Sequence, residues 1–286
     1  MKGLIIKKLA NRFWVKLDNG LTKDFIARKN LKSKNLFVGD QVEVNLLENV
    51  IDNLIQRKNE LVRPPLANID QMLIMLSSVP KPDFLVVDKL ILYCKTKNII
   101  PIIVINKSDL IKDENFIENI KFEYKEETII SISCKDNINI EQILNLLDNK
   151  ITAIAGQSAV GKSSLIKRLT GNNNIEIGEL SKKIERGKNT TRHCELFEIN
   201  NGYIADTPGF TFFDEDLLEI KSNDLKNYYN FFSNNCKFSS CVHINEDEKF
   251  CYIKKLLKDN KISYERYNRY VKIYLELKER EGKYGK

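Results

Sequence analysis

Short apolar segments separated by turn residues dominate the first 62 residues. Four of these segments are strand-like, at residues 4–6, 13–15, 25–27 and 42–46, and Asp18-Asn19-Gly20 is a hairpin signal between two of them. Several short strands at this spacing predict a small β-barrel, and a basic barrel suggests an oligonucleotide-binding (OB) fold. We therefore expect residues 1–62 to form an RNA-binding OB-fold domain, in which Phe13 and Trp14 either fill the core or stack on bases.

The character of the chain changes at Arg63-Pro64-Pro65. Two successive prolines hold the backbone extended and remove two hydrogen-bond donors, so a domain boundary is expected there. Beyond it, apolar strand patterns at 71–76 and 99–105 alternate with a helical pattern at about 82–97. Such alternation predicts a parallel sheet with crossover helices, and we expect an α/β domain over residues 63–220.

The segment from Gly156 to Ser163 matches the phosphate-loop pattern G-x-x-x-x-G-K-[ST] in full. A strand pattern at 151–155 precedes it and an amphipathic helix pattern follows, which is the setting in which backbone N–H groups cradle phosphates. Lys162 is expected to reach the β- and γ-phosphates, and the Ser163 hydroxyl to ligate Mg²⁺. The predicted phosphate-loop residues are Gly156, Gln157, Ser158, Ala159, Val160, Gly161, Lys162, Ser163 and Ser164.

A second motif, Asn106-Lys107-Ser108-Asp109, follows the apolar strand pattern at 102–105. Ligands bind at the carboxyl ends of strands in open α/β sheets, and the Asp109 carboxylate there can accept both the N1–H and the N2 amino hydrogens of guanine. Adenine does not offer that pair of donors, so the motif predicts GTP and opposes an ATP-dependent metabolic kinase. On a looser match, Ser133, Cys134 and Lys135 follow the strand pattern at 128–130 and are expected to back the base.

A third motif, Asp206-Thr207-Pro208-Gly209, follows the strand pattern at 203–205 and matches the D-x-x-G of GTPases. Asp206 is expected to hold Mg²⁺ through water, and the Gly209 N–H to sense the γ-phosphate. Within the polar stretch 186–192, either Thr190 or Thr191 is expected to complete the Mg²⁺ shell. The expected reaction is in-line attack of water on the γ-phosphate of Mg·GTP, with these groups and Lys162 supplying position and charge.

The order of the motifs is unusual. Ordinary GTPases carry the phosphate loop first and the guanine-reading motif late, whereas here Asn106 precedes Gly156. The domain is therefore predicted to be circularly permuted. Its motifs still meet at one end of the sheet, because permutation moves the termini and not the site.

Residues 221–286 are predicted to form a helical zinc-binding domain. Cys236-x₄-Cys241-x-His243-x₇-Cys251 offers three thiolates and an imidazole, a Cys₃His set that suits a structural zinc ion. Ser263 can cap a helix in which Tyr267 and Tyr274 fall at packing positions. Outside this set, Cys94, Cys134 and Cys194 are expected to fill apolar space, and Arg266, Arg269, Lys272 and Arg280 to face solvent or RNA phosphate.

Charge and composition bear on the expected binding partner and on the expected cellular compartment. The 286 residues carry a formal net charge of +7, with 12 basic and 7 acidic side chains in residues 1–62, 23 and 27 in 63–250, and 11 and 5 in 251–286. Basic ends around a mildly acidic centre suggest a catalytic module whose flanking parts bind a polyanion. The alternative is that the charged side chains only form ordinary solvated surfaces. No run approaches the roughly 18 apolar residues of a membrane span, and the N-terminus lacks a signal-peptide pattern, so a cytoplasmic protein without a membrane partner is expected.

Taken with these motifs, the chain resembles the circularly permuted GTPases that help mature the small ribosomal subunit. The resemblance spans the basic barrel, the permuted GTPase motifs and the Cys₃His segment. In the resembled family the gap before the last Cys is shorter by two residues, which makes Cys251 the least certain of the four expected ligands. It implies GTP hydrolysis to GDP stimulated by the small ribosomal subunit and coupled to release, with the subunit's rRNA as partner, Mg²⁺ at the nucleotide and one zinc ion. We expect no DNA partner, and a monomer.

Two positions bear on how water would be activated. Phe210 stands where Ras-like enzymes place a water-orienting Gln after D-x-x-G, as is usual in the resembled family. Members of that family often carry His just before the Thr pair, and this chain has Asn189, which does not change charge near neutral pH. An alternative therefore stays open, a GTP-regulated RNA-binding protein with little or no hydrolysis of its own.

Overall fold

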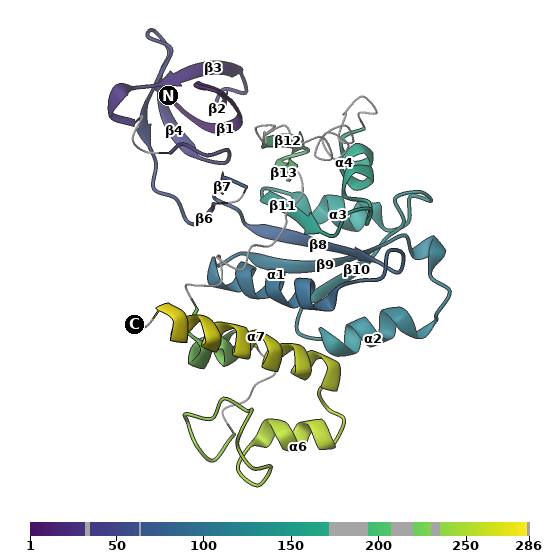
Figure 1. The fold of residues 1–286 in the computed structure, drawn as a ribbon. Helices are drawn as coiled ribbons and strands as arrows, with labels where there is room; N and C mark the ends of the chain where they lie inside the picture. Colours follow the sequence, from purple (N-terminus) through teal and green to yellow (C-terminus); the bar gives the residue numbers. More distant parts are fainter. Residues whose placement is uncertain (32–34, 63, 172–193, 207–219, 230–234, 285–286) are drawn as a thin grey trace, which may run out of the picture.

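The computed structural model of the chain describes residues 1–31, 35–62, 64–171, 194–206, 220–229 and 235–284 (Figure 1). A β-barrel, a sheet flanked by helices and a C-terminal helical part follow one another along the chain. Over these described ranges, no helix combines the length and the apolar character that crossing a membrane requires.

The N-terminal barrel is closed. Its strands are β1 (Lys2–Leu9), β2 (Arg12–Leu17), β3 (Thr22–Ala27), β4 (Gln41–Asn45) and β5 (Val50–Leu54). They pair in the order β1-β2-β3-β5-β4, and β4 pairs back with β1. Alternate side chains such as Ile5, Val15 and Phe25 point inward and are buried, as the period of two in a strand requires. The predicted OB-type barrel is confirmed.

Two details of the barrel qualify the sequence patterns. Phe13 is 6% exposed and belongs to the core, whereas its neighbour Trp14 is half-buried. The strand β5 was not among the predicted segments, because Asp52 and Asn53 interrupt its apolar pattern. It becomes a strand through its pairing with β3 and β4, a tertiary contact that overrides weak local propensity.

The central sheet is mostly parallel, as predicted. In the order β10-β9-β8-β11-β13, the parallel strands are β8 (Gln71–Ser77), β9 (Ile100–Asn106), β10 (Thr128–Ser131), β11 (Ile151–Gly156) and β13 (Gly202–Asp206). The exception is β12 (Glu195–Ile199), which the patterns did not predict and which runs antiparallel to β13. A short turn at Asn200 and Asn201 joins the two, and a connection that short allows only an antiparallel pair.

Helices cover both faces of this sheet. Alternate residues of β8 point in opposite directions, with Met72 and Ile74 in one apolar cluster and Leu73 and Met75 in another. The first cluster includes buried residues of α1 (Phe84–Thr96) and α2 (Asn115–Glu123), and the second those of α3 (Ile140–Leu147) and α4 (Lys162–Thr170). The predicted α/β architecture is therefore a three-layer one.

The barrel joins the sheet at the strand β12. Its contact with β1 is a single antiparallel bridge between Lys7 and Glu195. Two ion pairs reinforce it, Lys7 with Glu195 at 2.8 Å and Lys16 of β2 with Glu198 at 2.8 Å. Between barrel and sheet, the chain passes through a small two-stranded sheet of β6 (Glu60–Leu61) and β7 (Leu66–Ala67), on either side of the predicted proline boundary.

The C-terminal part is helical and packs against α1. It contains the 3₁₀-helix η4 (Ser222–Tyr228), α6 (Tyr252–Lys258) and the long α7 (Tyr264–Tyr284). The Ser263 hydroxyl accepts a hydrogen bond from the N–H of Arg266 at 3.1 Å, which is the predicted helix cap. Tyr267 and Tyr274 are buried in a cluster that includes Leu92 of α1, so the tyrosine stripe is a packing surface.

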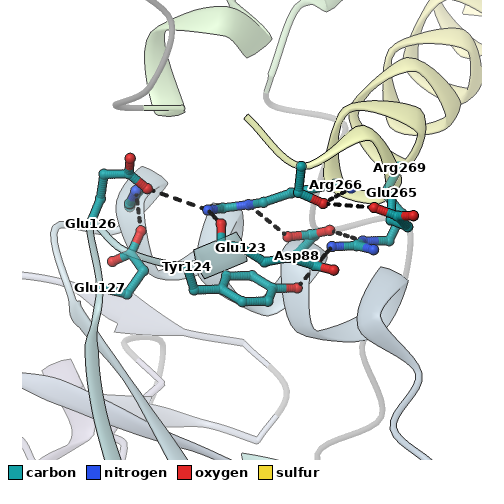
Figure 2. Close-up of polar contacts among 10 residues, drawn as sticks. Asp88, Glu123, Tyr124, Glu126, Glu127, Glu265, Arg266 and Arg269 are labelled. Carbon is teal, nitrogen blue, oxygen red and sulfur yellow. Dashed lines mark hydrogen bonds and ion pairs between the residues drawn. The ribbon is translucent and has the colours of Figure 1, made fainter. Parts of the chain in front are cut away.

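The prediction that Arg266 and Arg269 face solvent or RNA is wrong. Arg269 pairs with Asp88 on α1 and with Glu123 at the end of α2 (Figure 2). The Nε atom of Arg266 lies 3.4 Å from Oδ1 of Asp88, and its Nη1 lies 3.4 Å from Glu126. The two arginines are three residues apart and therefore share one face of α7, which is the face turned toward these acids.

Candidate nucleotide and metal sites

The phosphate-loop segment connects the end of β11 to the start of α4, as its pattern predicts. Lys162 is the first residue of α4, and Ser163 and Ser164 continue its first turn. The Lys162 ammonium donates to the carbonyl oxygens of Gly156 at 2.8 Å and Gln157 at 2.7 Å, which places it inside the curve of the loop. The helix N-terminus and the ammonium give this loop the positive character that binds phosphate.

Both glycines of the segment are required by their surroundings. Gly156 has φ +141° and Gly161 has φ +99°, conformations that side chains rarely adopt. A Cβ atom on Gly156 would lie 2.2 Å from the carbonyl oxygen of Met75, and one on Gly161 would lie 2.2 Å from Nδ2 of Asn106. The Asn106 side chain therefore occupies the space beside Gly161, so the Asn106–Asp109 motif lies directly against the phosphate loop.

Asn106 and Lys107 connect three loops. The buried Asn106 amide donates to the carbonyl of Val160 at 2.9 Å, and its oxygen accepts the N–H of Cys134 at 3.2 Å. Lys107, at φ 59°, donates to the carbonyl oxygens of Ala159 at 2.7 Å and Val79 at 2.8 Å. Side chains at the end of β9 therefore hold the phosphate loop and the Ser133–Lys135 segment in fixed relative positions.

Asp109 lies on the 3₁₀-helix η2 (Ser108–Leu110), and its side chain is held by a neighbouring loop. Oδ1 of Asp109 accepts a hydrogen bond from the buried Ser133 hydroxyl at 2.7 Å. An ionised carboxylate has room for several further donors, so this bond orients Asp109 without exhausting it. Ser133, from the segment that matched GTPases only loosely in sequence, thus contacts Asp109 of the motif that matched them closely.

A cavity of about 380 Å³ lies among these loops. Its lining residues are Asn106, Lys107, Asp109, Leu110, Cys134, Lys135, Gly161 and Ser164. A concave site with a few placed polar groups is typical of small-molecule binding. Cys134 lines this cavity, and burial raises the pKa of its thiol to about 11. Cys94 and Cys194 do not line the cavity and are buried in the core, as expected.

Two contacts, one made by the phosphate loop and one by the helix α4 that follows it, were not predicted. Oε1 of Gln157 accepts the N–H of Asp83 at 3.1 Å, and Asp83 is the N-cap of α1. Arg168 of α4 donates to the carbonyl of Cys134 at 3.1 Å. Asp83 just ahead of an apolar helix pattern is a recognisable cap signal, but the sequence carries no sign that a loop 74 residues away would meet it.

The predicted Mg²⁺ ligands are only partly within the described residues. Asp206 is the last residue of β13, which runs parallel to β11 with Ala205 opposite Ala153, so its backbone lies beside the strand that leads into the phosphate loop. Ser163 lies on the first turn of α4. Thr190, Thr191 and Gly209 lie outside the described residues, as do Asn189 and Phe210. Hydroxyl and carboxylate oxygens are the ligands that Mg²⁺ prefers.

Cys236, Cys241, His243 and Cys251 form one cluster, with all four ligand atoms within 4.8 Å of one another. Nδ1 of His243 lies 3.4, 3.3 and 3.6 Å from the sulfurs of Cys236, Cys241 and Cys251. Tetrahedral coordination with typical zinc bond lengths separates such atoms by about 3.5 Å. The cluster therefore fits a tetrahedral metal ion, and Cys251, despite its longer spacing, is placed with the other three.

The surrounding helices hold the cluster. The Tyr267 hydroxyl donates to the carbonyl of His243 at 2.6 Å, and the Tyr270 hydroxyl to that of Val242 at 2.9 Å. The N–H of Tyr252 donates to the sulfur of Cys236 at 3.2 Å. Burial lowers the pKa of His243 to about 4, which keeps its imidazole neutral and its Nδ1 able to bind a metal.

These parts together define a class of protein. An Asn-Lys-x-Asp motif that precedes the phosphate loop, both on one parallel sheet between a closed barrel and a helical part with a Cys₃His cluster, is the arrangement of a circularly permuted P-loop GTPase. A family model described as RsgA GTPase matches residues 54–216. The chain belongs to the RsgA GTPase family.

Similarity to relatives extends over nearly the whole chain. The small ribosomal subunit biogenesis GTPase RsgA of Ruminiclostridium cellulolyticum is 37% identical over 294 residues, covering 97% of this chain and 94% of that protein. The protein of the same name from a Geobacillus species is 36% identical and covers 99% of both chains.

Two solved structures share the fold. The structure of YjeQ from Thermotoga maritima has a TM-score of 0.82 at 28% identity and covers 96% of this chain and 98% of its own. YloQ, described as a circularly permuted GTPase, has a TM-score of 0.77 at 29% identity and covers 98% and 95%. The similarity therefore includes the barrel and the C-terminal part as well as the GTPase sheet.

Proposed function

We propose that this chain hydrolyses GTP to GDP and phosphate while bound to the small ribosomal subunit, and that it assists late maturation of that subunit. The observation that carries the proposal is the near full-length similarity to proteins named small ribosomal subunit biogenesis GTPases. The motif geometry supports the nucleotide, because Asn106, the phosphate loop and the Asp109 loop meet around one cavity.

Within that proposal each motif has a separate task. Asp109 reads the guanine edge, with Ser133, Cys134 and Lys135 behind the base, and the phosphate loop with Lys162 binds the phosphates. Ser163 and Asp206, with Thr190 or Thr191, would hold Mg²⁺, which supplies charge neutralisation on the β- and γ-phosphates. The Gly209 N–H would contact the γ-phosphate.

The Cys₃His cluster is proposed to hold one structural zinc ion. Soft thiolates and one imidazole in tetrahedral arrangement select zinc over magnesium or calcium. The four residues leave no coordination position for substrate, so the ion would stabilise the loops of residues 235–251 and take no part in hydrolysis.

The three predicted domains are proposed to divide the work. The basic barrel of residues 1–62 and the basic C-terminal domain of residues 221–286 would contact rRNA phosphates, and residues 63–220 would bind and hydrolyse GTP. We propose that the protein acts in the cytoplasm and associates with the subunit as a monomer.

The test is GTP turnover by the purified chain at fixed salt, alone, with small subunits and with large subunits. We expect slow hydrolysis alone and strong stimulation by small subunits only. Equal rates in all three reactions would contradict the ribosomal partner and leave the nucleotide assignment standing. Binding of GTP without single-turnover hydrolysis on small subunits would favour the alternative of a GTP-regulated RNA-binding protein, to which Asn189 and Phe210 point.

A further inference from the structure

We propose that two exposed aromatic side chains of the metal-binding loop, Phe238 and Phe250, stack on unpaired bases of the small-subunit rRNA, with Lys237 at the adjoining phosphate. This inference rests on the proposed function, since it names the part of the C-terminal domain that reads the RNA. We call Lys237, Phe238 and Phe250 the aromatic knuckle.

The two rings of the knuckle are more exposed than most of the described aromatic side chains of this domain. Phe238 is 48% exposed and Phe250 37%, although the core cluster of the same domain buries several tyrosines. The two rings meet edge to face, with centroids 5.7 Å apart and planes at 63°. In such an arrangement the edge of one ring covers one face of the other at most, and the exposed fractions of the two side chains show that ring surface is left for a further ring to stack on.

The metal cluster holds these two rings in place. Phe238 lies between the ligands Cys236 and Cys241, and Phe250 immediately precedes Cys251. The N–H of Lys237 donates to the carbonyl of Phe250 at 2.9 Å, and the N–H of Cys241 to that of Phe238 at 3.1 Å. A stacking surface whose backbone is already fixed loses little conformational entropy when a ligand binds.

One cation lies against both rings of the knuckle. The Lys237 ammonium lies 4.6 Å from the ring centroid of Phe250 and 5.7 Å from that of Phe238.

The acids of the same loop are engaged within the protein. The Glu246 carboxylate accepts the N–H groups of Val242 and Ile244 at 2.8 and 2.9 Å, and Glu248 pairs with Lys258 at 3.0 Å. Asp247 accepts the N–H of Lys249 at 2.9 Å. Among the described residues of this loop, the charged group in contact with both rings is the ammonium of Lys237.

Exposed rings beside a cation match the chemistry of a single-stranded nucleotide. Unpaired RNA bases stack on aromatic side chains, and Lys contacts the phosphate that follows them. A protein partner would instead cover the rings with apolar side chains, and the Lys237 ammonium over Phe250 opposes such a contact because burial would strip its water. RNA is the partner that uses all three side chains.

The test substitutes Phe238, which is farther from its nearest metal ligand in sequence than Phe250 is. We would compare Phe238→Leu and Phe238→Tyr with Phe122→Ala, a control on α2 whose side chain is 47% exposed. Binding of each full-length protein to purified small subunits and to a mixed-sequence single-stranded RNA oligonucleotide is measured at fixed salt. Zinc content and intrinsic GTP hydrolysis are measured on the same samples.

We expect Phe238→Leu to lower affinity for both probes roughly tenfold, because Leu keeps apolar volume and loses the stacking ring. Phe238→Tyr and Phe122→Ala should bind like the parent chain, and zinc content and intrinsic hydrolysis should not change in any variant. Lys237→Ala should lower the slope of log affinity against log salt by about one.

Unchanged affinity of Phe238→Leu for both probes would overturn the proposal. A loss confined to intact subunits, with oligonucleotide binding unaltered, would also overturn it, because the knuckle would then contact a ribosomal protein. Failure of the parent chain to be stimulated by small subunits is a separate result that contradicts the proposed function, and the oligonucleotide arm still decides whether the knuckle binds RNA.

Discussion

Arg269, on the C-terminal helix α7, forms an ion pair with Asp88, in the middle of α1 (Figure 2). The Asp88 side chain is fully buried, and Arg266 approaches it from the preceding turn of α7. Burial raises the pKa of Asp88, and the two guanidinium groups oppose that shift. Charge as well as apolar packing therefore joins the C-terminal part to the GTPase sheet.

The first prediction concerns this ion pair. Asp88→Ala should lower the free energy of unfolding by about 3–5 kcal/mol, because it leaves two largely buried guanidinium groups without their shared carboxylate. Urea unfolding measures the change. Glu118→Ala, which removes an exposed partner of Lys121, is the control and should cost less than about 1 kcal/mol. Equal losses of unfolding free energy in the two variants would mean that Asp88 contributes no more stability than an exposed acidic side chain does.

The second prediction concerns the contact between the two nucleotide loops. Gly161→Ala should lower GDP affinity at least about tenfold, because the added Cβ meets the Asn106 amide and must sit at positive φ. Calorimetry with GDP measures this. Gly282→Ala, whose Cβ meets nothing within 4 Å, should bind like the parent chain. Parent-like affinity for the Gly161 variant would show that the loops do not need their close approach.

The third prediction concerns the choice of base. Asp109→Asn should lower GTP affinity by about 10- to 100-fold, the range of a hydrogen bond to a charged group, and shift preference toward xanthine nucleotides. Competition binding with GTP and XTP measures both effects. Asp259→Asn, an exposed residue beyond α6, is the control. An Asp109 variant with no shift toward XTP would overturn the guanine role of Asp109.

The fourth prediction concerns the metal cluster. Cys251→Ser should reduce bound zinc well below one ion per chain and lower the temperature of thermal unfolding, because one of four ligands is lost. A chelator should have the same effect on the parent chain. Cys134→Ser should keep its zinc, since Cys134 lies in the nucleotide cavity. Full zinc content in the Cys251 variant would limit the site to three protein ligands.

The fifth prediction concerns the thiol of Cys134. With its pKa raised by burial to about 11, the thiol is almost entirely protonated near neutral pH, so alkylation by iodoacetamide should be slow there. The rate should rise about tenfold per pH unit up to about 10, because the thiolate is the reacting form. Bound GDP should slow it, since Cys134 lines the cavity. Peptide mass spectrometry measures the rate, and a pH-independent rate or no effect of GDP would contradict this picture.

The sequence by itself determined the features that depend on local spacing. The phosphate loop and the Asn106–Asp109 motif are continuous segments, and each follows an apolar strand pattern. Their order along the chain reveals the permutation. Their chemistry is carried by residue types at fixed offsets. The same holds for the Ser263 cap and for the four members of the cluster, Cys236, Cys241, His243 and Cys251.

Only the tertiary structure decided features that depend on partners distant in the chain. The strand β5 forms because β3 and β4 flank it, and β12 runs antiparallel because a short turn returns it beside β13. Gln157 contacts Asp83, and Arg266 and Arg269 pair with Asp88 instead of facing solvent. These partners are far apart in the chain, so no local pattern encodes the contacts. A charged residue on an amphipathic helix is assigned to solvent by its sequence, and it is buried when folding brings an opposite charge to the same face.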